Sequence, residues 1–257
     1  EYAVSPGLPE LISSLQQYYT TYNMDFESDE ILVTNGGSEA LFNIFTALLN
    51  KGDKVLIPTP AYPAYESIVT ILGGTVVNYS LDNEFKIDIE DIKNKIKDMN
   101  IKYLVLSLPS NPTGAILSKE EKNKLVHLIK ENDVIVITDE IYESLCYDEY
   151  HSVAQCNEIK DKIIYVGGFS KMFSMTGLRV GYYACCEKLM NEIIKIHQYN
   201  VSCAPSICQW AVYNGLKYGL QDVSYMKEVF NKRKNFVVSK LKDMGLDVVI
   251  PQGAFYV

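Results

Sequence analysis

The segment best suited to chemistry is GGFSKMFSMTGLRVGY, residues 167–182, which holds Lys171 in a small-residue loop and Arg179 eight positions later. A lysine amine that is partly desolvated and close to other cations can form a Schiff base with an aldehyde cofactor. An arginine can bind a phosphate through two parallel N–H bonds. Because a single lysine in such a loop is more often a solvated charge, the prediction depends on other residues.

A second segment, VIVITDEIYE (134–143), ends an apolar run with Asp139. Its carboxylate is either a helix N-cap or the counter-ion of a pyridinium nitrogen, which would keep that nitrogen protonated and the ring able to accept electrons. Tyr142 can donate a hydrogen bond to a ring oxygen, although a tyrosine in a chain that holds 19 is ordinarily a packing residue.

Three further segments add weaker signals. In VTNGGSEALFNIF (33–45), the N–H groups of Gly37 and Ser38 open a helix and offer an anion site. The segment lacks the lysine of a P-loop and the glycine spacing of a dinucleotide fold, which makes ATP and NAD poor candidates as ligands. Tyr62, in PTPAYPAYES, either stacks on a flat cofactor or packs in the core. Asn111, in the turn LPSNPTG, carries both a donor and an acceptor.

Hydrophobic periodicity predicts the elements that position these residues. Apolar strands alternating with helices indicate a largely parallel sheet covered on both faces, with ligands bound beyond the carboxyl ends of the strands. The terminal VVIPQGAFYV (248–257) predicts a strand, a turn and the start of another strand. The predicted helices are 8–22, 38–50, 88–99, 119–131, 187–199 and 207 into the 240s; the predicted strands are 54–58, 75–79, 102–109, 134–140, 163–169 and 178–185, with one more before Gly37.

Composition narrows the class of protein. The 257 residues are 47% hydrophobic, enough for one substantial core, and the net charge of −8 disfavours nucleic acid and anionic membranes as partners. No signal peptide or membrane-spanning run is recognisable. The six cysteines contain no C-x-x-C pair, and the three histidines are isolated, which favours reduced thiols in the cytoplasm and no metal site.

Taken in order, Gly-Gly-Ser, the aromatic loop, Asn-Pro-Thr-Gly, Asp-Glu-Ile-Tyr and Ser-Lys with a later arginine resemble the class I/II pyridoxal-phosphate-dependent aminotransferases of fold type I. The resemblance covers nearly the whole chain. It implies an α/β fold, a three-layer α/β/α large domain with a mainly parallel seven-stranded sheet. Residues 1–245 would form this pyridoxal-phosphate-binding domain, and residues 246–257 would begin a C-terminal small domain.

The resemblance also assigns roles around pyridoxal 5'-phosphate. Lys171 would hold the cofactor as an internal aldimine, and Asp139 would pair with the pyridine nitrogen. Asn111 and Tyr142 would contact the ring hydroxyl, and Tyr62 would stack on the ring. The cofactor-binding residues implied are Tyr2, Gly37, Ser38, Tyr62, Asn111, Asp139, Tyr142, Ser170, Lys171 and Arg179.

The phosphate would be held by Gly37, Ser38 and Arg179. Tyr2 resembles the family tyrosine that reaches the phosphate of the neighbouring subunit, which implies a homodimer. Family members often carry a serine three positions before the lysine. Here that position is Gly168, so Ser170 or the backbone would replace it.

The implied activity is transfer of an amino group between an L-amino acid and a 2-oxo acid, with Lys171 as the general base. The family's N-terminal segment and its substrate-binding arginine lie outside this sequence, so the donor amino acid stays open and the chain alone is expected to bind cofactor poorly. Two alternatives also stay open: a carbon-sulfur β-lyase on the same fold, and the non-catalytic effector domain of a transcription regulator.

Overall fold

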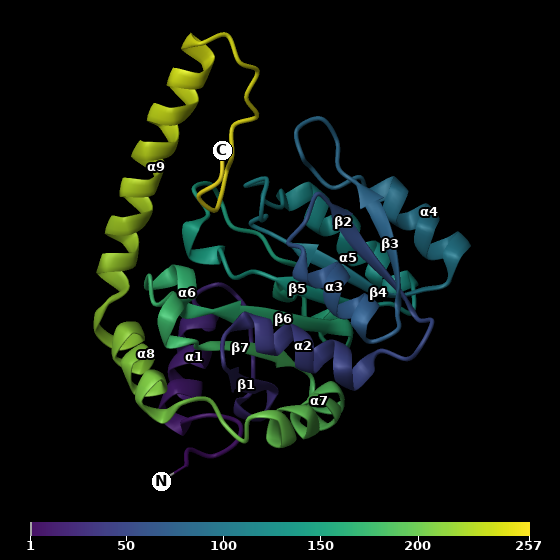
Figure 1. Cartoon of the computed structure of the whole chain (residues 1–257), viewed down its shortest axis with the longest axis vertical. Coiled ribbons are helices and arrows are strands. Elements are labelled where there is room, and N and C mark those ends of the chain that lie inside the picture. Colours follow the sequence, from purple (N-terminus) through teal and green to yellow (C-terminus); the bar gives the residue numbers. More distant parts are fainter. Residues whose placement is uncertain (1) are drawn as a thin grey trace.

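A seven-stranded sheet forms the centre of the computed structural model, which describes residues 2–257 (Figure 1). The strand order is β1-β7-β6-β5-β4-β2-β3. Only β7 is antiparallel to its neighbours, so the predicted mainly parallel sheet is confirmed. The strands are β1 (Ile31–Thr34), β2 (Lys54–Thr59), β3 (Thr75–Ser80), β4 (Ile101–Ser107), β5 (Ile135–Asp139), β6 (Ile163–Gly168) and β7 (Gly181–Cys185).

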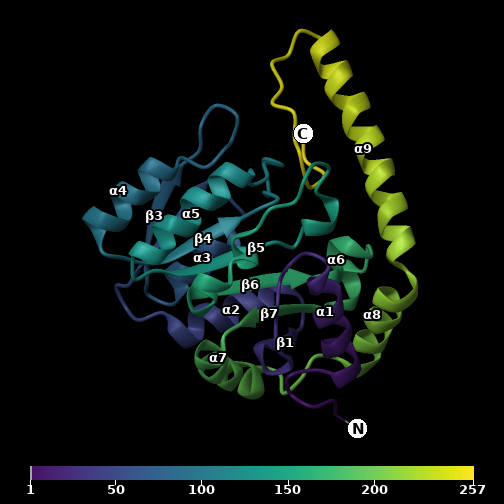
Figure 2. The same ribbon diagram turned by 180° about the vertical axis from the view of Figure 1, so that it is seen from behind.

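Helices cover both faces of this sheet and complete the three layers that the resemblance implied (Figures 1 and 2). Helices α2, α3 and α7 pack on one face; α1, α8, α4 and α5 pack on the other. The helices are α1 (Pro9–Thr20), α2 (Gly37–Leu48), α3 (Ala64–Ile71), α4 (Ile89–Met99), α5 (Lys119–Glu131), α6 (Phe169–Met172), α7 (Glu187–Asn200), α8 (Ser206–Tyr218) and α9 (Leu220–Asp243).

The central strands are apolar throughout because successive side chains enter different cores. In β5, Val136 packs with α4 and α5, whereas the next residue, Ile137, packs with α2, α3 and α7. In β4, Leu104 and Val105 divide in the same way. This alternation is the period-two geometry of a strand with both faces buried.

Beyond shifts of one or two residues at element ends, three elements differ from those that the sequence predicts. Helix α3 was missed; Pro63 precedes it and a glycine pair follows it, so only eight residues carry its pattern. The predicted strand 178–185 begins only at Gly181, because Arg179 has a left-handed backbone with φ 56°. The long helix predicted from Ile207 is two helices, since the backbone at Gly219 is not helical (ψ 6°).

The predicted strands in the C-terminal VVIPQGAFYV are wrong. After α9 the chain turns back toward the sheet (Figure 1), and its backbone groups bond to loops rather than to a strand. Gln252 N and Gly253 N donate to Gly114 O at 2.9 and 2.8 Å, and Gln252 O accepts from Tyr147 N at 2.8 Å. With its hydrogen bonds used in this way, the segment forms only an isolated bridge between Cys146 and Gly253.

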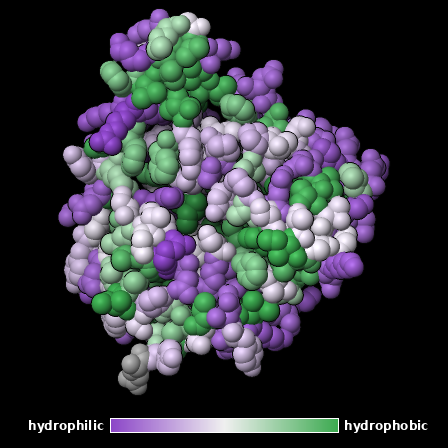
Figure 3. All heavy atoms as spheres, viewed as in Figure 1, coloured by the Kyte–Doolittle hydropathy of each residue, from purple (hydrophilic) through white to green (hydrophobic). Residues whose placement is uncertain are grey.

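Apolar side chains gather on the surface over the end of α9 and this returning segment, where Figure 3 shows a large hydrophobic area. Their exposure is unusual beside the buried cores of the sheet. The exposed side chains in this region include Phe236, Val237, Met244, Leu246, Ile250, Phe255 and Val257.

Candidate active site

The residues that could take part in chemistry lie together at one end of the strands, along a single edge of the sheet. Strands β1, β6, β5, β4 and β2 run in the same direction, so their carboxyl ends share this edge. Because β7 runs the opposite way, its beginning, next to Arg179, lies there too. Asp139 ends β5, Lys171 follows β6 and Arg179 precedes β7, so the topology places these residues on three neighbouring strands, spaced about 4.8 Å apart.

A pocket of about 410 Å³ opens at this edge; we call it the edge pocket. Every site residue predicted from the sequence except Tyr2 lines it. Tyr2 is 86% exposed, and its predicted contact with a neighbouring subunit stays a prediction. The lining residues are Gly37, Ser38, Leu41, Tyr62, Tyr65, Ser107, Asn111, Asp139, Ile141, Tyr142, Ser170, Lys171, Thr176, Arg179 and Tyr256.

Asp139 is a buried carboxylate, 7% exposed, at the carboxyl end of β5. Oδ2 accepts from the Tyr65 hydroxyl at 2.7 Å, and Oδ1 accepts from Ile141 N at 3.2 Å. Burial raises the pKa of Asp139, and these two hydrogen bonds only partly offset the rise. Within residues 2–257 no cation pairs with it, so a positively charged ligand group would stabilise its ionised form.

Lys171 lies on the short helix α6, directly after β6. Its Nζ is 5.9 Å from the centre of the Tyr142 ring and 5.6 Å from that of Phe255. Across the described part of the chain it forms no ion pair with a carboxylate. The Tyr142 hydroxyl lies 2.6 Å from the Tyr256 hydroxyl. The amine is therefore held between aromatic faces and is available to a ligand.

Arg179 and the turn before α2 form a cationic cradle. Arg179 Nη1 donates to Thr176 O at 3.0 Å, and Nη2 donates to Asn35 O at 3.4 Å. Gly36 has φ 81°, and a Cβ there would collide with the Arg179 guanidinium. Helix α2 starts at the next residue, so its unpaired N–H groups and the guanidinium face the same pocket. An anion is the ligand that this cradle suits.

Packing explains why a glycine occupies position 168. A Cβ there would lie 2.6 Å from Ile141 Cδ1 and 3.3 Å from Gly181 Cα. A serine would therefore displace its neighbours, whereas Ser170 lines the edge pocket without this conflict.

Two residues of the edge pocket were not predicted. Tyr65 supplies the hydrogen bond to Asp139, and its ring meets that of Tyr62 edge-on at 5.6 Å. The three-residue spacing of Tyr62 and Tyr65 was a usable signal once a helix was expected there. Tyr256 reaches the pocket from the far end of the chain, and no local pattern indicated it.

A buried polar cluster lies behind Asp139 and is made of Glu140, Glu143 and their hydroxyl donors. Glu140 accepts from Thr138 at 2.6 Å, from Ser152 at 2.5 Å and from the Tyr150 hydroxyl. Burial raises the pKa of Glu140 to about 8. Burial also raises the pKa of Glu143 to about 7, although the Tyr165 hydroxyl donates to it at 2.6 Å.

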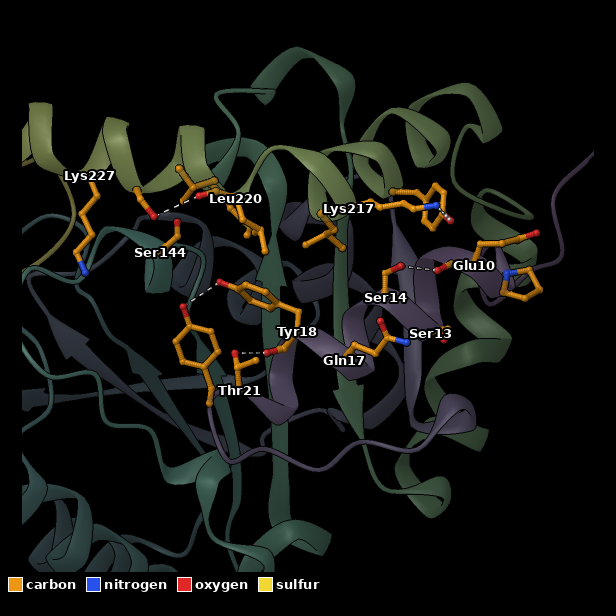
Figure 4. Close-up of a pocket in the computed structure, with 17 residues that line it drawn as sticks. Glu10, Ser13, Ser14, Gln17, Tyr18, Thr21, Ser144, Lys217, Leu220 and Lys227 are labelled. Carbon is orange, nitrogen blue, oxygen red and sulfur yellow. Dashed lines mark hydrogen bonds between the residues drawn. The ribbon is translucent and has the colours of Figure 1, made fainter.

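A larger groove of about 910 Å³ lies between α1 and the start of α9 (Figure 4). Figure 4 shows Tyr18 of α1, and Thr21 just after the end of α1, below Leu220 and Ser144, with Lys217 beside Leu220 and Lys227 at one end. None of the predicted site residues lines this groove. Volume alone therefore does not identify the site, and the edge pocket is the one that combines a carboxylate, an amine and an anion cradle.

No helix in residues 2–257 is long and apolar enough to cross a membrane. The same residues hold no group of three or more His, Cys, Asp or Glu side chains placed to bind a metal.

Comparison with known proteins identifies the family. The family model described as aminotransferase class I and II matches residues 1–257. The chain belongs to this aminotransferase family. Its cofactor is pyridoxal 5'-phosphate.

The relatives and solved structures that this chain resembles carry different aminotransferase names. An aspartate aminotransferase of Thermotoga maritima is 40% identical, over 91% of this chain and 62% of the relative. A Bacillus subtilis relative named for N-acetyl-LL-diaminopimelate is 40% identical, over 100% of this chain and 65% of the relative. The solved aromatic aminotransferase of Pyrococcus horikoshii has a TM-score of 0.94 at 32% identity and covers 99% of this chain and 70% of that one. The chain thus spans about two thirds of the length of its curated relatives.

The edge pocket fits the family cofactor in its distribution of charge. An anionic phosphate suits the cradle at β1 and β7, an aldehyde suits the amine that follows β6, and a protonated pyridine nitrogen suits the uncompensated carboxylate that ends β5. Gly36 supports this fit, because any side chain there would fill the cradle.

Proposed function

We propose that this chain is the cofactor-binding part of an aminotransferase that moves an amino group between an L-amino acid and a 2-oxo acid. The observation that carries the proposal is the meeting, in one pocket, of Lys171, Asp139 and Arg179 with no partner of opposite charge for any of them within residues 2–257. The relatives are named aminotransferases, which favours amino transfer over β-elimination or effector binding.

In the proposed enzyme each residue has a distinct task. When bound, pyridoxal phosphate supplies an aldehyde and a ring that takes up electrons from the substrate carbon. Lys171 is the residue that would hold it, and its Nζ would then remove the α-proton of the substrate and deliver a proton to the cofactor carbon that carried the aldehyde. Asp139 would hold a proton on the pyridine nitrogen.

The remaining residues position the flat ring and its phosphate. Asn111 and Tyr142 would contact the ring hydroxyl, and Tyr62 would stack on the ring. The phosphate would be bound by Gly37, Ser38, Ser170 and Arg179, all of which line the edge pocket.

We also propose how the domains and subunits of this protein are organised. Residues 1–245 would form the cofactor-binding large domain, and residues 246–257 would begin a small domain that covers the exposed apolar side chains at the end of α9. The protein would act as a homodimer in the cytoplasm, with Tyr2 reaching the phosphate bound by its partner. The high exposure of Tyr2 supports that assignment. The relatives' names differ in substrate, so we propose no specific donor amino acid.

The direct test is Lys171→Ala in the full-length protein. The unmodified protein should take up pyridoxal phosphate with a visible absorbance band and transfer amino groups. The variant should lose the band, and its turnover should fall by at least about 10³-fold because both the covalent link and the base are gone.

Lys217→Ala is the matched control. Lys217 Nζ also lies over two aromatic rings, those of Tyr213 and Tyr218, at 5.5 and 5.2 Å, but on α8 away from the edge pocket. It should keep both the band and the turnover. A Lys171→Ala protein that retained the absorbance band, or an unmodified protein that released only ammonia from amino acids, would overturn the proposal.

A further inference from the structure

The buried histidine of α7 faces two hydrogen-bond acceptors. His197 is fully buried in the last turn of α7. Its Nδ1 lies 2.7 Å from Glu39 Oε1, and its Nε2 lies 3.0 Å from Ser5 O. The carbonyl oxygen of Ser5 can only accept, so Nε2 is placed to donate to it, and Nδ1 is placed to donate to an ionised Glu39. This arrangement suits a cationic ring, which the C-terminal end of a helix also favours.

Glu39 provides the negative charge of this pair. Its Oε1 also accepts from Asn43 Nδ2 at 2.7 Å, and its Oε2 accepts from Asn35 N at 2.5 Å. Burial opposes ionisation of Glu39, but the hydrogen bonds from His197, the Asn35 backbone and Asn43 outweigh it and lower the pKa of Glu39.

The pair acts on the turn that precedes α2. Glu39 accepts from the N–H of Asn35, and Arg179 donates to the C=O of the same residue at 3.4 Å. Asn35 leads directly into Gly36 and the first N–H groups of α2, which are the proposed phosphate site. Glu39 therefore fixes this turn. Its negative charge would, however, repel a phosphate bound nearby.

We infer that His197 is a positioning residue that neutralises Glu39, so that Glu39 can hold the Asn35–Gly36 turn in its anion-binding shape without repelling the cofactor phosphate. This inference rests on the proposed function and extends it to two further parts of the chain, α7 and the N-terminal segment at Ser5. It predicts a role specific to the phosphate, because the pair touches the turn and no part of the ring site.

The test compares binding of pyridoxal 5'-phosphate with binding of pyridoxal, which lacks the phosphate, in the full-length protein. His197→Gln leaves Glu39 without its cation. Its dissociation constant for pyridoxal 5'-phosphate should rise on the order of tenfold, the effect of about one pKa unit of lost interaction. Binding of pyridoxal should be unchanged. His127→Gln, which removes an exposed histidine from α5, is the control and should alter neither.

The double variant Glu39→Gln/His197→Gln tests the charge argument. It removes both charges, so it should recover much of the phosphate-specific loss, which a merely structural role of His197 would not allow. Equal losses for both ligands, or no recovery in the double variant, would overturn the inference. An unmodified protein that binds neither ligand would instead overturn the proposed function.

A spectroscopic measurement covers the case in which His197→Gln does not fold. In the protein with ¹⁵N-labelled histidine, this chain contributes three imidazole rings, those of His127, His151 and His197, each with two ring nitrogens. The buried ring should show protons on both nitrogens, protected from exchange with water. A single ring N–H for His197 would contradict the pair.

Discussion

Asp139 and Glu140 are consecutive buried carboxylates with opposite surroundings. Asp139 faces the edge pocket, with one hydroxyl and one backbone N–H as donors. Glu140 faces the polar cluster and accepts from three hydroxyl groups. Burial raises the pKa of both side chains. Both carboxylates are thus buried and have a raised pKa, but only Asp139 faces a cavity that a ligand can enter.

This difference shows that a buried charge marks a functional site only when its remaining bonding capacity faces an open space. In the polar cluster, tyrosine, serine and threonine hydroxyls fill that capacity, and the result is a structural network. In the edge pocket a carboxylate, an amine and a guanidinium remain without partners of opposite charge in the described chain. Such unsatisfied charges cost stability, and a ligand of matching charge offsets that cost.

The largest expected effect on kcat comes from replacing each of the two carboxylates in turn by the corresponding amide. Asp139→Asn should lower kcat of the full-length enzyme on the order of 10³-fold, because the amide cannot hold a proton on the pyridine nitrogen. Glu140→Gln should leave kcat nearly unchanged, since the amide can replace the protonated acid among hydroxyl groups. Steady-state kinetics on both variants makes the comparison; similar losses in kcat would show that the two carboxylates do not differ in role.

A smaller effect is expected from Tyr65→Phe. It removes the 2.7 Å hydrogen bond to Asp139 Oδ2, which raises the pKa of Asp139 further and should lower kcat about tenfold. Tyr79→Phe is the control, because Tyr79 is equally buried and its hydroxyl donates to Val105 O at 3.0 Å, away from the edge pocket. Comparable losses of kcat in the two variants would indicate a general packing effect.

The smallest effect concerns the polar cluster and the dependence of stability on pH. The pKa of Glu140 rises from 4.5 to about 8 on folding, so between these values the native state holds a proton that the unfolded chain has lost. Stability from this group is therefore present below pH 4.5 and is lost as the pH rises toward 8.

Thermal unfolding of the cofactor-free full-length protein should show a Tm that falls by several degrees between about pH 5 and pH 8. Glu140→Gln should flatten this slope, whereas Glu131→Gln, at an exposed position on α5, should not. A slope that is unaffected by Glu140→Gln would show that the cluster is not the group that titrates.

Much of the edge pocket could be predicted from the sequence because the fold brings strand ends together. Asp139, Lys171 and Asn111 each follow a recognisable apolar strand, and in a parallel sheet those ends share one edge. Order along the chain was therefore enough to group them. The returning C-terminal segment could not be predicted, since its apolar residues satisfy the pattern of a strand while its backbone bonds to loops.

The sequence by itself determined the alternation of strands and helices, the family, and the identity of the residues beyond the strand ends. Only the tertiary structure decided which of these residues are unpaired. The contacts that separate Asp139 from Glu140, bring Tyr65 to Asp139 and join His197 to Glu39 link side chains up to 158 positions apart. Local periodicity reports which face of an element is buried, but it does not report which partner meets that face across the core.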